Sequence, residues 1–183
     1  IAGYGFEIYH DKAKDSVMSI LMLAMMVPFV AVLVPLFQMF TQAGLINSWI
    51  GFILPSISTP FLIMYFRNSA RSFPRDTLEA ARIDGLNEFQ IFVRMFVPMM
   101  RPTYAAAATI TFMNAWNAYL WPKVIMQTND SITMPMMVAN LMGGYVIDYG
   151  VVMAGVTICS LPTVIIFFVL QKSFTNAVAG AVK

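Results

Sequence analysis

The sequence predicts an all-α membrane protein, a polytopic helix bundle. Of its 183 residues 59% are hydrophobic and only 11% are charged, and the mean hydropathy is +0.72. This composition is far more apolar than that of soluble domains. The charges gather in residues 67–101, which hold six of the eleven Lys and Arg residues and four of the nine Asp and Glu residues. Nearly uncharged blocks flank this stretch, so it is expected to be a water-facing contact element carried by membrane spans.

Four blocks are long enough to span a bilayer, which takes about 20 apolar residues in a helix. None of the four contains a charged residue. They predict spans at approximately 16–40, 48–66, 102–122 and 151–171.

A fifth apolar stretch, residues 132–145, is too short to span easily, and we expect it to be an interfacial helix or loop outside the membrane. With four spans, ten of the eleven basic residues fall on one side and only Lys123 on the other. That excess marks the cytoplasmic side, so the loop 67–101 is predicted to be cytoplasmic. A fifth span would move Lys172 and Lys183 outside and weaken the asymmetry.

The predicted spans contain several prolines, each of which removes a backbone donor and bends its helix. Such kinks are frequent in transporters, although ordinary packing kinks explain any single proline equally well. The prolines concerned are Pro28, Pro35, Pro55, Pro60 and Pro162.

The chain reads as one transmembrane domain, residues 1–183, that is incomplete at its N-terminus. It starts at Ile1 in what resembles the tail of an apolar segment, and it shows no signal peptide. We therefore expect further spans before residue 1.

Within the charged loop the sequence predicts a helix, a glycine turn and a second helix. Pro74 suits a first helical turn, and Gly85 is placed to terminate that helix as its C′ residue. Asn87 can cap a second helix, with Gln90 completing a capping box. Pro98 ends the second helix before the next span.

The second of these helices is expected to have one apolar face, formed by residues at i, i+3, i+4 and i+7. One reading of the loop is a solvated segment that only sets orientation. A DNA-binding helix-turn-helix is disfavoured because the loop is tethered between two spans. The residues of the apolar face are Phe89, Phe92, Val93 and Phe96.

The spacing of Glu79-Ala80-Ala81, Gly85 and Pro98 resembles the EAA signature of the permease subunits of ABC importers, E-A-A-x3-G-x9-I-x-L-P. The chain differs in having Met95 and Val97 at the Ile and Leu positions. The resemblance implies a type I importer permease fold, in which this loop forms coupling helices that dock on an ATPase subunit. The residues it assigns to coupling are Glu79, Ala80, Ala81, Asp84, Gly85 and Pro98.

Three other segments extend the resemblance over the whole chain. Residues 2–8 resemble the segment after the family's second span. Residues 112–122 resemble the F-x-x-x-W-N-x-x-x-W-P stretch of carbohydrate-importer permeases. Residues 180–183 resemble the tail of the MalG-like subgroup, which implies that Gly180 and Lys183 contact the ATPase. Six spans are usual in the family.

A polar and aromatic cluster in the third predicted span is a candidate substrate pathway. Amides suit sugar hydroxyl groups, and flat aromatic faces suit the apolar faces of a pyranose ring. The same residue types also bond to neighbouring helices or form the interfacial aromatic belt, and in this family the partner permease can make most of the sugar contacts. The candidates are Asn114, Trp116, Asn117 and Tyr119.

The sequence shows no catalytic constellation, and we expect a protein that is not an enzyme. It lacks a G-x-x-x-x-G-K-[ST] loop, so ATP hydrolysis must come from a partner. With one histidine, His10, and one cysteine, Cys159, a metal site is not expected. The spans also lack buried acids or a nucleophile with a base.

The resemblance implies a sugar-import permease in a bacterial or archaeal cytoplasmic membrane, embedded in lipid and binding no cofactor itself. The implied partners are an ABC ATPase dimer, a second permease subunit and an extracellular solute-binding protein that delivers an oligosaccharide-type sugar. No nucleic-acid partner is expected. The alternatives are a permease for another solute, such as glycerol phosphate or peptide, and a membrane scaffold or receptor that transports nothing.

Overall fold

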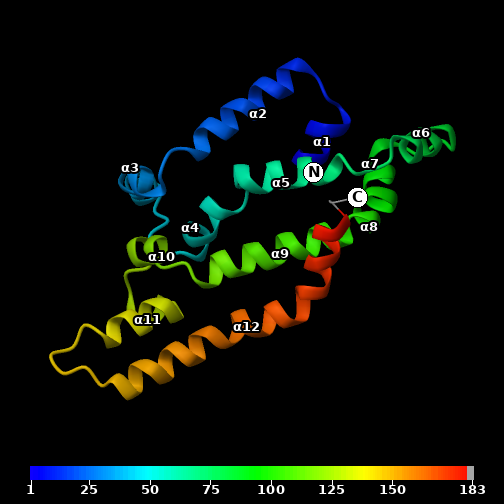
Figure 1. Cartoon of the computed structure of the whole chain (residues 1–183). Coiled ribbons are helices and arrows are strands. Elements are labelled where there is room, and N and C mark those ends of the chain that lie inside the picture. The colour runs from blue at the N-terminus through cyan, green and yellow to red at the C-terminus, as the bar shows by residue number, and fades with distance from the viewer. Residues whose placement is uncertain (181–183) are drawn as a thin grey trace. The chain divides into compact units, whose positions relative to one another are not determined.

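The computed structural model describes the backbone of residues 1–180 and the side chains of these residues apart from Asn129 and 172–180. All regular structure in the described residues is helical (Figure 1), which confirms the predicted fold class. The helices are α1 (Ala2–Ile8), α2 (Lys12–Met25), α3 (Phe29–Gln42), α4 (Trp49–Ile53), η1 (Leu54–Ser56), α5 (Pro60–Ala70), α6 (Arg75–Ile83), α7 (Glu88–Ile91), η2 (Phe92–Phe96), α8 (Val97–Met99), α9 (Arg101–Trp116), α10 (Leu120–Ile125), η3 (Asn129–Ser131), α11 (Met134–Leu141) and α12 (Tyr149–Gly180).

The chain forms two compact units. The first unit comprises residues 1–25 and 60–108, together with the segment that begins at Leu170. The second comprises residues 26–59 and 109–169. The charged loop 67–101 therefore belongs entirely to the first unit, and the predicted pathway residues belong to the second.

One described helix, Tyr149–Gln171, is long and apolar enough to cross a membrane alone. Two further pairs of helices pass the same test only when each pair is taken together: α2 with α3, and α4–η1 with α5. The first break, residues 26–28, includes Pro28, and the second ends at Pro60, the first residue of α5. Both positions are in keeping with the missing backbone donor of proline. Residues 102–122 are likewise divided, between α9 and α10. The four spans stay predictions.

Most of the local structure predicted for the loop is confirmed, but Pro98 does not end the second helix: it lies in the first turn of α8, where its missing N–H costs nothing, and the helix continues to Met99. Helix α6 begins at Arg75 directly after Pro74. After its end, Gly85 has a φ of +82°, a left-handed conformation that glycine adopts without steric cost. At α7, Asn87 Oδ1 accepts from the Gln90 amide at 2.9 Å and Gln90 Oε1 accepts from the Asn87 amide at 3.0 Å. This is the predicted capping box.

The apolar face predicted for the second helix is divided in the structure. Phe96 is 1% exposed and Phe92 is partly buried, whereas Phe89 is 72% exposed. Phe89 lies in the first turn of α7, and a wide π-helical turn, η2, follows α7. A π-turn closes i→i+5 hydrogen bonds instead of i→i+4 bonds, so residues after Ile91 leave the face that an ideal α-helix would present.

The core of the first unit joins the loop to helix α1. The Tyr4 ring, 6% exposed, meets the Phe96 ring at 4.6 Å and the Phe92 ring at 5.1 Å, both in edge contacts. Full burial of a large apolar side chain contributes about 1.5–3 kcal/mol, so this cluster stabilises the loop. Its buried members are Tyr4, Ala70, Phe73, Leu78, Ala81, Ile91, Phe96 and Met100.

In the second unit, Trp121 is the centre of a smaller core. Its indole Nε1 donates to the carbonyl oxygen of Gly51 at 3.2 Å, and its ring meets that of Phe40 at 5.2 Å. Nearby, Asn47 adopts a φ of 55°. Its Oδ1 accepts from the amides of Gln127, at 2.5 Å, and Thr128, at 3.2 Å. These bonds join the loop before α4 to the loop after α10.

Replacing Gly3 with valine should destabilise the first unit. A Cβ atom at this position would lie 2.6 Å from Phe66 Cβ and 2.7 Å from the Arg67 amide nitrogen, so α1 would have to move away from α5. We expect a loss of about 1–3 kcal/mol, measured as a lower Tm in detergent. The matched control is Gly5→Ala, because a Cβ there meets nothing within 4 Å. Equal Tm values for the two variants would contradict the close approach of the helices.

Candidate functional site

A buried arginine organises the base of the loop. Arg67, at the end of α5, is 8% exposed, and its Nε lies 3.3 Å from Glu7 Oε2 while Nη2 lies 2.7 Å from Asp15 Oδ1. The other carboxylate oxygen of Asp15 lies 3.1 Å from His10 Nε2. Because a buried charge is costly unless it is paired, the three helices α1, α2 and α5 are held together at this point.

A second ionic contact closes the loop across its glycine turn. Arg82 Nε, in the last turn of α6, lies 2.8 Å from Glu88 Oε1, in the first turn of α7. A hydrogen bond from Tyr9, followed by the contact with Arg82, lowers the pKa of Glu88. Burial, followed by the hydrogen bond to Glu88, raises the pKa of Tyr9 to about 12. The side chain of Tyr9, the residue that follows α1, thus influences the ionisation of this pair.

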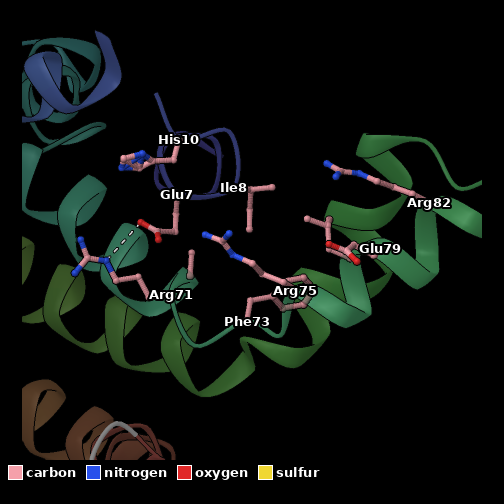
Figure 2. Close-up of a pocket in the computed structure, with 10 residues that line it drawn as sticks. Glu7, Ile8, His10, Arg71, Phe73, Arg75, Glu79 and Arg82 are labelled. Carbon is pink, nitrogen blue, oxygen red and sulfur yellow. Dashed lines mark hydrogen bonds and ion pairs between the residues drawn. The ribbon is translucent and has the colours of Figure 1, made fainter. Parts of the chain in front are cut away.

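A polar cavity of about 280 Å³ lies between α1 and α6. Figure 2 shows side chains from both elements around it, with the Arg71–Glu7 ion pair (3.5 Å) as a dashed line. Among the described residues, neither Arg75 nor Glu79 of this cavity forms an ion pair. The lining residues are Glu7, Ile8, His10, Ala70, Arg71, Phe73, Arg75, Leu78, Glu79 and Arg82.

The structure brings the predicted coupling residues together on one loop but divides them by burial. Ala81 is 2% exposed and packs in the core of the first unit, where its small size leaves room for the aromatic rings. Its role here is packing. The other five are exposed: Glu79, Ala80, Asp84, Gly85 and Pro98.

Two exposed apolar side chains flank the glycine turn: Ile83, 86% exposed, and Phe89, 72% exposed. Sequence reasoning missed Ile83, although its position two residues before Gly85, outside the face of Leu78 and Ala81, could have indicated it. Phe89 belongs to the apolar face that the sequence predicts for the second helix. Large apolar residues exposed on a charged loop indicate a contact surface.

The predicted pathway residues cluster at the C-terminal end of α9 and before α10. The Trp116 indole donates to the carbonyl oxygen of Cys159, on α12, at 2.8 Å and stacks on Phe112 at 5.8 Å. Asn117 Nδ2 donates to the Met113 carbonyl at 2.8 Å. Trp116 and Asn117 thus use side-chain N–H donors in hydrogen bonds within the protein. Asn114 and Tyr119 are exposed. Their part in substrate passage stays a prediction.

The predicted contact of the C-terminal tail with an ATPase concerns Gly180 and Lys183. Gly180 is the last residue of α12, and Lys183 lies outside the described residues. Among the described residues there is also no group of three or more His, Cys, Asp or Glu side chains suited to hold a metal ion.

Comparison with known proteins agrees with the loop and the fold. The protein family described as "Binding-protein-dependent transport system inner membrane component" matches residues 1–180 of the chain. The lactose transport system permease protein LacG of Rhizobium radiobacter is 45% identical over the whole chain, which covers 67% of that protein. The arabinooligosaccharides transport system permease protein AraQ of Bacillus subtilis is 35% identical over 99% of the chain and 65% of its own length. The chain spans about two thirds of the length of these relatives.

A solved structure shares the fold. It is a bacterial ABC transporter involved in the import of the acidic polysaccharide alginate, with a TM-score of 0.82 and 22% identity. The match covers 94% of this chain and 66% of that one.

An all-helical chain of this fold with an EAA-spaced loop belongs to the permease class of membrane proteins. The chain belongs to the family of binding-protein-dependent transport system inner membrane components. The resemblance to ABC-importer permeases is thereby confirmed, as are the assignments to an inner-membrane protein and to a non-catalytic subunit that binds no cofactor.

The Arg82–Glu88 contact should make the loop sensitive to acid. Because the pKa of Glu88 is lowered from its ordinary value of 4.5, its contribution to stability is present above that value and is lost as the pH falls through the folded pKa. We expect amide hydrogen exchange in residues 83–90, corrected for intrinsic rates, to quicken in this acidic range.

The control for this acid effect is Glu88→Gln, which removes the titrating group. In this variant the backbone amides of residues 83–90 should exchange quickly at neutral pH, and their exchange rate should change much less as the pH is lowered. An acid response as large as that of the unaltered protein would show that another group is responsible.

Proposed function

We propose that the chain is the permease subunit of an ATP-driven, binding-protein-dependent importer of oligosaccharide-type sugars. It would form half of the translocation pathway and couple to a separate ATPase. The observation that carries the proposal is the loop 67–101, in which an EAA-spaced helix, a glycine turn and a capped second helix present exposed side chains on a buried aromatic base. Membership of the permease family supports it.

The loop surface fits a protein partner. Ile83 and Phe89 offer apolar area on either side of the turn, and such exposed anchors supply much of the affinity when a partner buries them. Arg75 and Glu79 offer charges of both signs that are unpaired among the described residues. The partner we propose is an ATPase dimer, with one ATPase subunit docking on this loop.

Transport would proceed by alternating access. Closure of the ATPase dimer on ATP would displace the docked loop, and the loop would carry the helices packed on it. Since Arg67 and Tyr4 fix the loop to α1, α2 and α5, this displacement would reach the membrane helices. A second permease subunit would form the other half of the pathway, and an extracellular binding protein would deliver the solute.

An oligosaccharide is the solute best supported. The relatives are named for lactose, for arabinooligosaccharides and, in Thermoanaerobacterium thermosulfurigenes, for starch degradation products. Asn114 and Tyr119 remain exposed beside Trp116 and Asn117, and amides with aromatic faces suit sugar hydroxyl groups and ring carbons.

Replacing Gly85 with valine should uncouple ATP hydrolysis from transport. A β-branched residue is strained at a φ of +82°, so the turn between the docking helices would change shape. We expect transport per ATP hydrolysed to fall about tenfold or more, corresponding to roughly 1.4 kcal/mol of lost coupling. The measurement is ATPase activity and uptake in proteoliposomes.

The control for the turn is Gly85→Asn, because asparagine tolerates the left-handed conformation and a Cβ at this position meets nothing within 4 Å. It should retain most of the coupling. Normal coupling in Gly85→Val would rule out the proposed role of the turn.

Purification from detergent should yield the chain together with an ATPase and a second permease subunit. A membrane scaffold or receptor would lack this pair of partners.

Uptake of a panel of labelled solutes then tests the substrate class: we expect oligosaccharides to be taken up and glycerol phosphate and peptides to be excluded. Failure of every sugar, with uptake of another solute, would overturn the sugar assignment and leave the importer intact.

A further inference from the structure

Another polar cavity, of about 240 Å³, lies in the second unit and is lined by residues of α10, of α11 and of the segment between them. Its lining combines four polar side chains with two buried methionines, which are 2% and 3% exposed. It includes no residue of the loop 67–101 and none of the four candidate pathway residues. The polar residues are Lys123, Gln127, Thr128 and Asn140, and the methionines are Met126 and Met136.

Asn47, from the segment before α4, fixes one part of the cavity wall. Its Oδ1 accepts from the Gln127 amide at 2.5 Å and from the Thr128 amide at 3.2 Å, and its own amide donates to the Ile125 carbonyl at 2.9 Å. Its φ of 55° lies in the left-handed region, which asparagine tolerates better than most residues. Three hydrogen bonds from one residue therefore hold the backbone that carries two of the polar side chains.

The polar side chains can offer a ligand both donors and an acceptor. Gln127 Nε2 donates to the Val124 carbonyl at 3.2 Å, which leaves Gln127 Oε1 as an acceptor. Asn140 Oδ1 accepts from Lys123 Nζ at 3.4 Å, which leaves the Asn140 amide and the other Lys123 protons as donors. Within the part of the chain that the structure describes, Lys123 forms no ion pair.

This mixture suits a ligand that is rich in hydroxyl groups. A hydroxyl group both donates and accepts, so one sugar ring can satisfy Gln127 Oε1 as well as the donors of Lys123 and Asn140. An anion such as phosphate or a carboxylate offers mainly acceptors and would bring no donor for Gln127 Oε1. The cavity is also smaller than the roughly 300–1,000 Å³ of pockets that hold drug-sized ligands, so its size suits one ring of an oligosaccharide.

The distribution of basic residues predicts which side of the membrane this cavity faces. Lys123 is the one basic residue that the four-span arrangement places outside. A solute delivered by an extracellular binding protein would arrive on the same side. The cavity is therefore predicted to be open to a solute that has not yet crossed the membrane.

We propose that this cavity is a sugar-binding site on the outer side of the permease, that it takes one ring of an oligosaccharide-type solute, and that Asn47 is the positioning residue that shapes it. The inference rests on the proposed function for the class of solute and deepens it by adding a site separate from the candidate pathway. Lys123, Gln127 and Asn140 bond to the sugar hydroxyl groups, and the methionine side chains contact the ring carbons.

The test is the protection of an introduced thiol by sugar. Thr128→Cys is made in the full-length chain, which is assembled with its partner subunits in proteoliposomes without the binding protein. Labelling at position 128 by a membrane-impermeant thiol reagent is timed by mass spectrometry. The matched control is Asp130→Cys, because Asp130 is exposed on the same segment and does not line the cavity.

We expect lactose, the sugar for which one relative is named, to slow labelling at position 128 about threefold when it is present at about twice its Kd. Labelling of Asp130→Cys should not change. Lys123→Met, combined with Thr128→Cys, should weaken the protection because it removes a donor. No protection by lactose or by an arabinooligosaccharide would overturn the inference, and so would equal slowing at both positions or protection by inorganic phosphate alone.

Two variants of Asn47, each combined with Thr128→Cys, test the positioning role. Asn47→Gly permits the left-handed backbone but removes Oδ1, so sugar should protect position 128 much less. Asn47→Asp keeps an acceptor oxygen in the same place and should retain the protection. Full protection in Asn47→Gly would remove the positioning role, as would a loss in Asn47→Asp as large as that in Asn47→Gly.

Uptake by the complex with its binding protein added separates this inference from the proposed function. Import of sugar without protection at position 128 would remove the cavity as a sugar site and leave the importer intact. If no sugar is imported, the proposed function fails, and the labelling rates then decide the inference alone.

Discussion

The first unit depends on the pairing of one buried cation. Arg67 is 8% exposed, and a guanidinium in that position without carboxylate partners would cost several kcal/mol. Two acids from different helices, Glu7 and Asp15, meet this requirement. Since each acid belongs to its own helix, the pairing of Arg67 holds the C-terminal end of α1 and the first turn of α2 against α5. The close approach at Gly3 and the contact of Tyr4 with the loop are compatible with that arrangement.

The loop combines a rigid base with an exposed rim. Its base consists of packed rings and the small Ala81, which contact α1. Its rim carries Ile83 and Phe89, together with the charges of Arg75 and Glu79, which form no ion pair within the described part of the chain. These two properties serve one purpose in the proposed function. A partner that moves the exposed surface of the loop can displace the helices behind it only when the residues between them are closely packed.

Local features of the loop could be predicted from the sequence, because they depend on neighbouring residues. Pro74, Gly85 and the Asn87–Gln90 capping box each act within about one turn. The division of the apolar face could not be predicted, because Phe92 and Phe96 are buried against Tyr4, some ninety residues earlier in the chain, and no local pattern indicates that contact. The partners of Arg67 could not be predicted for the same reason: nothing near Arg67 in the sequence indicates Glu7 or Asp15.

In the candidate pathway, the residue types indicated a polar cluster, whereas only the structure shows that the Trp116 indole donates a hydrogen bond to a backbone carbonyl of α12.

The division of the chain into two units has an evolutionary consequence. All loop residues lie in the first unit and all candidate pathway residues lie in the second. Substitutions at distant sites without shared contacts act nearly independently on stability. Under the proposed function, a lineage can therefore alter Asn114 or Tyr119 to accept a new solute while the unit that carries the coupling loop stays unchanged. Gene duplication followed by drift in one unit would supply new uptake systems that still accept the same type of motor.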